Sequence, residues 1–184
     1  MSTASTTNTS TSTTVTTSTV PTTSPSEPDI SLNMLGASIR VSDPYGIRFG
    51  IQFDKNEFYQ TADIVEYGTL IIGSGTLGGA ELTLETPSIR RIKAENILSE
   101  DNSKIVYTGV LINIPESFFD TNVTARGYVI YRDSNGNECV AYTVTATKNF
   151  RSVAQAAYDK YSAIVNPSAA EQAIIEKLAG IISR

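Results

Sequence analysis

The chain has 184 residues and a formal net charge of −5, and it contains no His, no Trp and a single Cys. The absence of His removes the commonest general base and metal ligand. One Cys excludes an intramolecular disulfide and a zinc site of the Cys/His type. The mild acidity offers little charge to neutralise phosphates, so we expect no nucleic-acid binding. No apolar run approaches the roughly 18 residues of a membrane span, so we expect no membrane insertion.

Residues 1–30 are predicted to lie outside the folded body. The first 26 of them include 19 Ser or Thr and no charged residue. Such a segment has too little apolar surface to offset the entropy of ordering, which predicts a disordered Thr/Ser-rich tail or linker. It also lacks the charged n-region and the apolar h-region of a signal peptide. We therefore expect either export by another route or a piece cut from a longer protein.

A β-strand pattern begins after the tail. Residues 37–41 alternate, and the Asp-Pro-Tyr-Gly sequence at 43–46 predicts a turn. In residues 47–53, Ile and Phe alternate with Arg, Gly and Gln, which is the clearest pattern of a half-buried strand in the chain. A loop or a single helical turn is predicted over residues 54–63. Residues 64–72 are dense in aliphatic side chains and predict a more central strand.

The segment TLIIGSGTLGGAELTL, residues 69–84, contains Gly73, Gly75 and Gly78 at the G-x-G-x-x-G spacing of dinucleotide-binding loops. That motif requires a helix to follow it, because the helix N-terminus holds the phosphates. Residues 80–87 instead alternate apolar and polar side chains and end in Pro, which predicts a strand. We therefore expect a flexible connection between strands, in which Gly allows positive φ, and no cofactor.

The second half of the chain continues the β pattern. Residues 88–98 fit neither a helical nor a strand period, whereas residues 105–114 predict a strong strand. Residues 123–132 and 138–147 flank an Asp-Ser-Asn-Gly-Asn sequence, and Asn-Gly is the strongest short hairpin signal. About seven short strands without helices between them predict an all-β fold over residues 31–150, an antiparallel β-sandwich of the Ig-like type.

Two amphipathic helices are predicted over residues 151–184, as a helical hairpin. Ser152 with Gln155, and Ser168 with Glu171, have the spacing of capping boxes. The second helix carries an apolar face that must bury against the sheet or against another chain. Its residues are therefore candidates for an association surface: Ile174, Ile175, Leu178, Ile181 and Ile182.

Five segments of the predicted body, in the same order and with matched turns, resemble one known module. They are GASIRVSDPYGIRFGIQFDK (36–55), VEYGTLII (65–72), YTGVLINIPE (107–116), TARGYVIYRDSNGNE (124–138) and RSVAQAA (151–157). The chain looks like an accessory β-sandwich module that recurs in large secreted and cell-surface proteins of anaerobic gut Firmicutes. This resemblance implies a noncatalytic module with an extracellular or cell-surface location. The family has no agreed catalytic or ligand residues, so the resemblance implies none here.

The predicted strand over residues 123–132 offers a candidate face for a ligand or a partner. If its apolar residues point inward, then Arg126, Tyr128 and Arg132 lie together on the opposite face. An aromatic ring between two guanidinium groups could stack on a sugar or pair with acidic groups of a partner. The alternative is a solvated face on which the arginine stems cover the tyrosine.

Other candidate sites have plainer explanations. Asp133, Asn135 and Asn137 occupy positions 1, 3 and 5 of a calcium loop, but Gly is fourth and the twelfth residue is Val144, so a hairpin turn is favoured and no metal is expected. Cys139 is expected to be a free, buried, apolar residue.

Paired carboxylates could indicate a glycosidase, as in Glu81 with Glu85 or Glu100 with Asp101. Nothing in their spacing places two of them across a cleft. Ser and Thr are abundant, but without His a nucleophile would need Lys or a carboxylate as its base, and no S-x-x-K pattern occurs. We therefore predict that the chain is not an enzyme.

Two functional hypotheses follow. The leading one is a noncatalytic module of an extracellular or cell-surface bacterial protein that binds or positions a polysaccharide or a surface-protein partner. The alternative is a structural assembly subunit, of a virion or surface appendage, in which the C-terminal helices pack against other copies in a homo-oligomer. The second helix separates the two hypotheses, because folding back onto its own sandwich would make the module self-contained.

Overall fold

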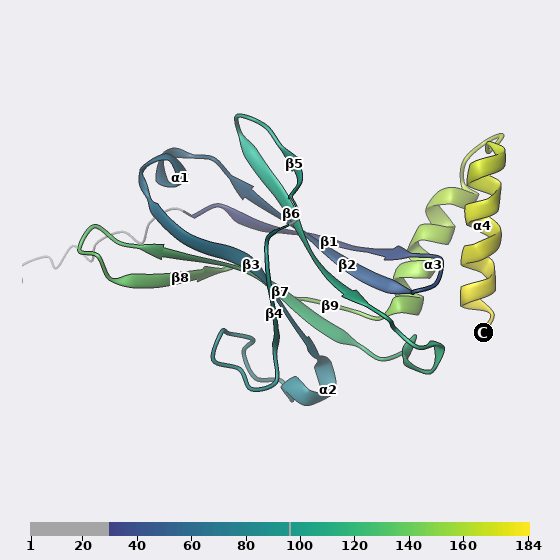
Figure 1. Ribbon diagram of the computed structural model, residues 1–184. Coiled ribbons are helices and arrows are strands. Elements are labelled where there is room, and N and C mark those ends of the chain that lie inside the picture. Colours follow the sequence, from purple (N-terminus) through teal and green to yellow (C-terminus); the bar gives the residue numbers. More distant parts are fainter. Residues whose placement is uncertain (1–29, 96) are drawn as a thin grey trace, which may run out of the picture.

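The computed structural model describes residues 30–95 and 97–184, so the predicted tail lies outside the described residues except for Ile30. The described part consists of two antiparallel sheets followed by two helices (Figure 1). A mostly β body with a C-terminal helical pair is therefore confirmed. The helices stand at one end of the sheets, next to the turn that joins the first two strands.

The first sheet, sheet A, has four strands. Along the sheet they are β1 (Leu32–Arg40), β2 (Gly46–Asp54), β6 (Lys104–Ile112) and β5 (Ile97–Glu100). The predicted strong strands over 47–53 and 105–114 are β2 and β6, which pair along their whole length. β5 pairs only with residues 105–107 of β6. Beyond Tyr107, the edge of β6 that faces away from β2 borders no strand of sheet A within the described ranges.

The second sheet, sheet B, has five strands. They are β4 (Arg90–Lys93), β3 (Asp63–Gly73), β7 (Val123–Arg132), β8 (Glu138–Tyr142) and β9 (Ala146–Lys148), and both β8 and β9 pair with β7. The single strand predicted over 138–147 is thus interrupted. At the break, the buried Thr143 hydroxyl accepts a hydrogen bond from the Gly127 amide (2.9 Å) and donates one to the Val144 carbonyl (2.7 Å).

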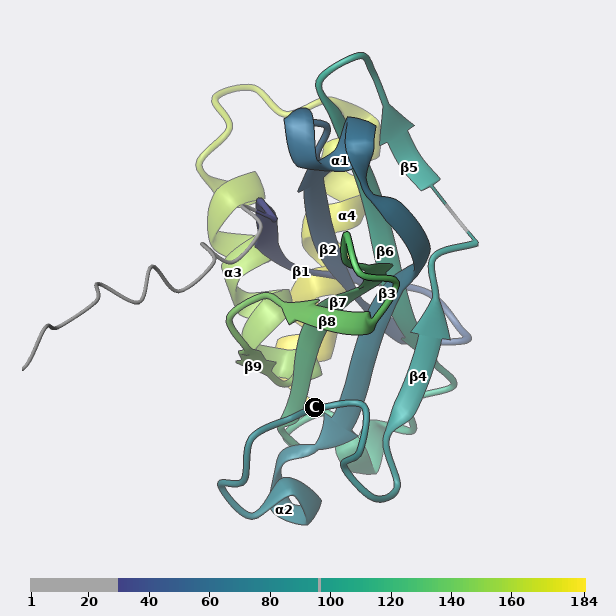
Figure 2. The ribbon, with the colours of Figure 1, turned by 90° about the vertical axis from the view of Figure 1, so that its left-hand side faces the viewer.

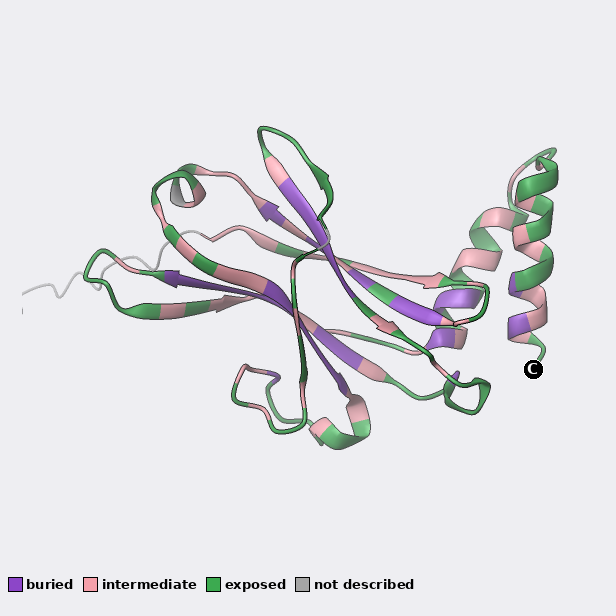
Figure 3. Cartoon of the chain, in the orientation of Figure 1, coloured by how far each residue is buried: buried purple, intermediate pink, exposed green. Residues whose placement is uncertain are grey.

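The main core lies between the two sheets. The alternation over residues 47–53 is confirmed, since Ile47, Phe49, Ile51 and Phe53 are all buried. They pack against inward-facing residues of sheet B, among them Val129. The buried stretches run along the central strands of both sheets (Figure 3). Each large apolar side chain buried in this way contributes about 1.5–3 kcal/mol.

A second core covers the outer face of sheet B. The segment over residues 74–89 lies on this face, and its Leu82 is fully buried against Tyr128 and Leu70. This segment begins with the short helix α2 (Ser74–Leu77) and continues as an irregular loop beside β4 (Figure 2). The strand predicted over 80–87 is therefore wrong. Its alternation arises because Leu82 and its apolar neighbour two residues on both face the sheet, although the backbone pairs with no strand.

The glycine-rich segment is a connection that follows a strand, and it lacks the long helix that a dinucleotide-binding loop requires. Gly73 ends β3, and Gly78 and Gly79 have positive φ angles of 62° and 84°. Glycine adopts this conformation without a steric penalty. The connection leads into a loop rather than into a second strand or a long helix.

Two short helical elements and two edge strands occupy the remaining connections. The helical elements are α1 (Glu57–Thr61), which matches the predicted helical turn, and the 3-10 helix η1 (Glu116–Phe118). The ambiguous stretch over 88–98 supplies the edge strand β4 and the start of β5. Both strands are short, which explains why neither period was clear in the sequence.

The last two helices are α3 (Phe150–Ser162) and α4 (Ala169–Ile182). The capping box of Ser168 with Glu171 is confirmed at the start of α4. The predicted Ser152–Gln155 box is wrong, because Asn149 caps α3 and accepts a hydrogen bond from the Ser152 amide (2.7 Å). The helix starts three residues earlier than that box implied.

An aromatic cluster joins these helices to the end of the sandwich. Phe150 stacks on Phe119 with ring centroids 4.4 Å apart, and Tyr45 meets Phe119 edge-on at 5.2 Å. The three rings come from the start of α3, the β6–β7 connection and the β1–β2 turn. Leu178 and Ile181 of α4 pack onto the same cluster. In the described part of the chain, no helix is long and apolar enough to cross a membrane.

Candidate functional site

The predicted ligand face on β7 is not open to solvent. Arg126, Tyr128 and Arg132 do lie on the side of β7 opposite the main core, as the alternation predicts. However, the segment over residues 74–89 covers this side, and Tyr128 has no exposed surface. The interpretation of Tyr128 as an exposed stacking platform is therefore wrong. Antiparallel sheets often leave one face in water, but here a distant part of the chain covers it.

Internal contacts occupy the guanidinium group of Arg126. It donates hydrogen bonds to the carbonyl oxygens of Leu82 (2.9 Å) and Thr143 (2.8 Å). It also pairs with Glu81 at 2.8 Å and lies over the Tyr142 ring, 4.5 Å from the centroid. Arg126 thus ties the covering segment to the sheet, and its role is structural.

Arg132 lies apart from the other two residues of the predicted face. It is exposed at the end of β7 and pairs with Asp63 at 2.8 Å. Together with the burial of Tyr128, this means that the three side chains do not form one accessible surface.

Tyr128 belongs to a polar cluster that the sequence did not reveal. Its hydroxyl donates to the Glu66 carboxylate (2.5 Å), which also pairs with Arg91 (2.6 Å) and Lys93 (2.5 Å). A β-bulge in β3, just before Glu66, brings this carboxylate onto the outer face of sheet B. Arg91 and Lys93 reach it from β4, so the cluster ties three strands together.

The electrostatics of this cluster favour a fixed charge rather than proton transfer. Burial alone would raise the pKa of Glu66, but hydrogen bonds from Lys93, Tyr128 and Arg91 outweigh it and lower that pKa to about 2. Burial, reinforced by the hydrogen bond to Glu66, raises the pKa of Tyr128 to about 12. At neutral pH the carboxylate is therefore charged and the phenol is neutral.

We predict that Glu66→Gln lowers the free energy of unfolding at neutral pH by about 1–3 kcal/mol, because hydrogen bonds to a charged group are lost. The pKa of Glu66 is depressed in the folded chain, so its contribution is complete above the unfolded value of about 4.5 and is lost as the pH falls toward 2. Urea unfolding across this pH range should give a flatter profile for the variant. Glu176→Gln, at an exposed position on α4, should keep the wild-type profile.

The candidate association helix packs within its own chain. Leu178 and Ile181 are buried in the aromatic end cluster, and Ile174 and Ile182 contact that cluster while half-buried. Ile175 is also half-buried. The second helix therefore folds back onto its own sandwich, which is the arrangement expected of a self-contained module.

The predicted hairpin turn over residues 133–137 is confirmed. The Asp133 carboxylate accepts hydrogen bonds from the amides of Asn135 and Asn137, both at 2.8 Å, and Gly136 has a φ of 81°. The carboxylate therefore stabilises the turn itself. Within residues 30–95 and 97–184, no three acidic, Cys or His side chains are grouped to hold a metal ion. Cys139 is half-buried rather than fully buried and packs against the main core.

Three of the four carboxylates considered for a glycosidase have structural partners, and Glu81 has already been described with Arg126. Glu100 pairs with Lys55 at 2.6 Å. Asp101 accepts hydrogen bonds from the backbone amides of Ser103 (2.7 Å) and Lys104 (2.9 Å) and so shapes the turn before β6. A hydrogen bond from the Ser103 hydroxyl (2.7 Å), together with those from the two amides, lowers the pKa of Asp101.

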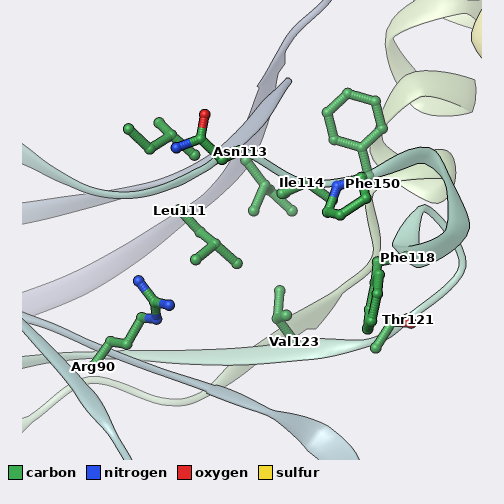
Figure 4. Close-up of a pocket in the computed structure, with 11 residues that line it drawn as sticks. Arg90, Leu111, Asn113, Ile114, Phe118, Thr121, Val123 and Phe150 are labelled. Atoms are coloured by element: carbon green, nitrogen blue, oxygen red, sulfur yellow. The ribbon is translucent and has the colours of Figure 1, made fainter. Parts of the chain in front are cut away.

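A pocket near the helical end of the sandwich is the best candidate for a binding site. It has a volume of about 340 Å³ and is open to solvent on one side. We call it the end pocket, and its walls come from β2, β4, the end of β6 with the following loop, η1, the start of β7, and α3 (Figure 4). The apolar lining includes Ile47, Leu111, Ile114, Phe118, Val123 and Phe150.

Polar and exposed groups lie around this apolar lining. Arg90, from the edge strand β4, approaches Leu111 from the opposite wall (Figure 4). Phe118 and Ile112 each remain 54% exposed. Asn113 has a φ of 59°, a left-handed conformation that Asn adopts more readily than most residues other than Gly. A concave apolar site with a few polar groups is the usual form of a ligand pocket.

The sequence did not indicate the end pocket. Its residues come from segments that are far apart in the chain, and their patterns were those of ordinary strands. The one local signal was the cluster of apolar residues around Pro115 and Phe118, at the end of β6 and in the turn after it, where polar residues are more usual.

In comparisons with protein-family models, curated proteins and solved structures, the chain matches none of them. The resemblance to the Firmicutes accessory module thus stays a prediction.

Proposed function

We propose that this chain is a noncatalytic binding module of an extracellular or cell-surface bacterial protein, and that it engages a protein partner through the end pocket. The Ig-like form of the β-sandwich belongs to the same proposal. Two antiparallel sheets with a core between them support it. The loops at the end of such a sandwich are a usual position for a binding surface.

The apolar lining of the end pocket is the observation that carries the proposal. The lining provides aliphatic and aromatic side chains, with Arg90, Asn113 and Thr121 as its polar members. Proton transfer or nucleophilic attack is usually carried out by the side chains of His, Asp, Glu, Lys, Tyr or Cys, or by an activated hydroxyl of Ser or Thr. An apolar cavity with an exposed aromatic rim instead suits an apolar side chain of a partner.

A protein partner is favoured over a polysaccharide for a specific reason. The β7 face is the surface where the sequence offers stacking on a sugar as one interpretation, with the Tyr128 ring as the platform. Tyr128 is fully buried and its hydroxyl is bonded to Glu66. Sugars need polar groups beside an aromatic face, whereas the end pocket is mostly apolar.

We predict that the peptide N-acetyl-Gly-Phe-Gly-amide binds in the end pocket, with a Kd in about the millimolar range expected for a single anchor. A titration followed by ¹H–¹⁵N spectra should shift the amide signals of Leu111, Ile114 and Thr121. Thr121→Trp, which places a ring at the exposed rim, should abolish these shifts. Thr145→Trp, on an exposed loop between β8 and β9, should leave them unchanged.

A parallel titration with cellohexaose separates the two classes of partner. Shifts with the peptide and none with the sugar would support the proposal. Shifts with cellohexaose alone would overturn the choice of a protein partner, and shifts with neither would remove the end pocket as a binding site.

A further inference from the structure

Arg90 points toward the inside of the sandwich although it lies on an edge strand. It is paired with Ile71 of β3 in the antiparallel register, and directly paired residues project to the same side of a sheet. Ile71 is buried in the main core. Arg90 therefore lies on the core-facing side of β4, but at the open edge of the sandwich, where β4 of one sheet passes β6 of the other and where its side chain stays exposed. In Figure 4 its guanidinium group extends toward Leu111 of β6.

Arg90 differs from three other arginines in its lack of an ion pair. Arg91, Arg126 and Arg151 each pair with a carboxylate at 2.6–2.8 Å. In the described part of the chain, Arg90 forms no ion pair. The other lining residues of the end pocket are uncharged, so this guanidinium group makes the pocket positive. An unpaired cation beside an apolar cavity is complementary to an anion that carries an apolar group.

The same part of the sandwich has an open strand edge. β5 covers residues 105–107 of β6, and residues 108–112 have no strand on that side within the described ranges. An uncovered edge presents unpaired N–H and C=O groups to an incoming chain. Residues 111 and 112, at the end of this stretch, also line the end pocket. An extended peptide that adds to the edge would therefore run directly into the pocket.

We propose that the end pocket recognises the carboxyl terminus of a partner protein. The final residues of the partner extend along residues 108–112 of β6 as an added strand, the last apolar side chain fills the pocket, and the terminal carboxylate pairs with Arg90. This inference depends on the proposed binding function and names its ligand class. Strand addition with a pocket for one side chain is an established mode of peptide recognition.

The open strand edge decides between a peptide and another apolar carboxylate. A fatty acid would satisfy the apolar lining and Arg90, but it has no backbone groups to pair with β6. A peptide satisfies all three features at once. The guanidinium group can bind a carboxylate through two parallel hydrogen bonds, which also orients the chain end.

The test uses an acetylated hexapeptide of alternating Val and Thr that ends in Phe, prepared with a free carboxylate and with a carboxamide terminus. Binding to the full chain is measured by calorimetry and ¹H–¹⁵N spectra. We expect the free acid to bind about tenfold more tightly than the amide, because the amide loses the charged pair. Arg90→Gln should remove this difference. Arg48→Gln, an exposed arginine on the outer face of β2, should retain it.

Two further arms identify the ligand class. N-methylation of alternate amides in the hexapeptide should weaken binding for one set of positions and not for the other, since only one edge of an added strand pairs with β6. Octanoate is the lipid-like comparison. If octanoate binds and neither peptide does, the assignment of a peptide ligand is overturned. Size-exclusion chromatography checks that Arg90→Gln stays monomeric, because inward-pointing charges also guard sheet edges.

The binding data distinguish a wrong ligand class from a wrong binding site. If acid and amide bind equally, and Arg90→Gln changes neither, the pocket is a binding site but not for a carboxyl terminus. If neither peptide shifts the signals of residues that line the end pocket, the proposed function fails as well.

Discussion

Gly68→Ala is expected to destabilise the folded chain by about 3 kcal/mol or more, the upper range for inserting a group into a packed interior. Gly68 lies in β3, between Lys93 of β4 and Tyr128 of β7. A Cβ at this position would overlap the backbone carbonyl oxygen of Ile92 and would lie 2.7 Å from the Tyr128 hydroxyl oxygen. The carbonyl cannot move without disturbing the β3–β4 ladder, so the strand must shift.

The matched control for this variant is Gly50→Ala in β2. A Cβ there would meet the Leu35 side chain at 3.5 Å, which is an ordinary contact. Alanine in place of glycine at an unstrained site stabilises by about 0.4–1 kcal/mol, through the unfolded state. Urea unfolding of both purified variants measures the difference. Equal stabilities would show that β4 is not held against β3 as described.

Leu178→Ala is expected to lower the free energy of unfolding by about 2–5 kcal/mol, as for other fully buried leucines. Leu178 has no exposed surface and packs against Phe119 and Phe150. Ile175→Ala, at a half-buried position of the same helix, should cost less. Thermal and urea unfolding of the two variants would test this ranking. Similar losses would mean that α4 is not docked through Leu178.

The docked position of α4 also predicts how truncation acts on association. A chain that ends at Asn166 loses Leu178 and Ile181 and leaves the aromatic end cluster uncovered. Exposed apolar patches of this kind promote association. Light scattering across a dilution series should therefore show a monomeric full chain and a truncated chain with a stronger tendency to associate. A full-length oligomer that dissociates on truncation would instead support the assembly alternative.

Strong local patterns predicted much of the fold. The alternation in β2, the Asn-Gly hairpin after β7 and the capping box of α4 each depend on residues close together in sequence. Alternation also placed Arg126 and Tyr128 on the same side of β7. The alternation could not indicate whether this side of β7 is exposed, because Leu82, which covers it, lies more than 40 residues earlier in the chain than Arg126 and Tyr128.

Nonlocal packing explains the other differences. Residues 80–87 alternate because Leu82 faces sheet B from a loop, and period two does not distinguish a strand from a loop with alternating contacts. The end pocket and the inward direction of Arg90 depend on the pairing of β4 with β3, which the ambiguous stretch over 88–98 did not define. Asn149 rather than Ser152 caps α3, so that Phe150 can stack on Phe119.

The burial of both faces of β7 has a consequence for the dynamics of the chain. β7 lies at the centre of sheet B, with β3 on one edge and β8 and β9 on the other. The main core covers its inner side, and the cluster around Tyr128 covers its outer side. Local fraying cannot release such a strand, so its amide hydrogens should exchange with solvent only when the whole body unfolds. Their exchange rates would then report the global free energy of unfolding from the intact native chain.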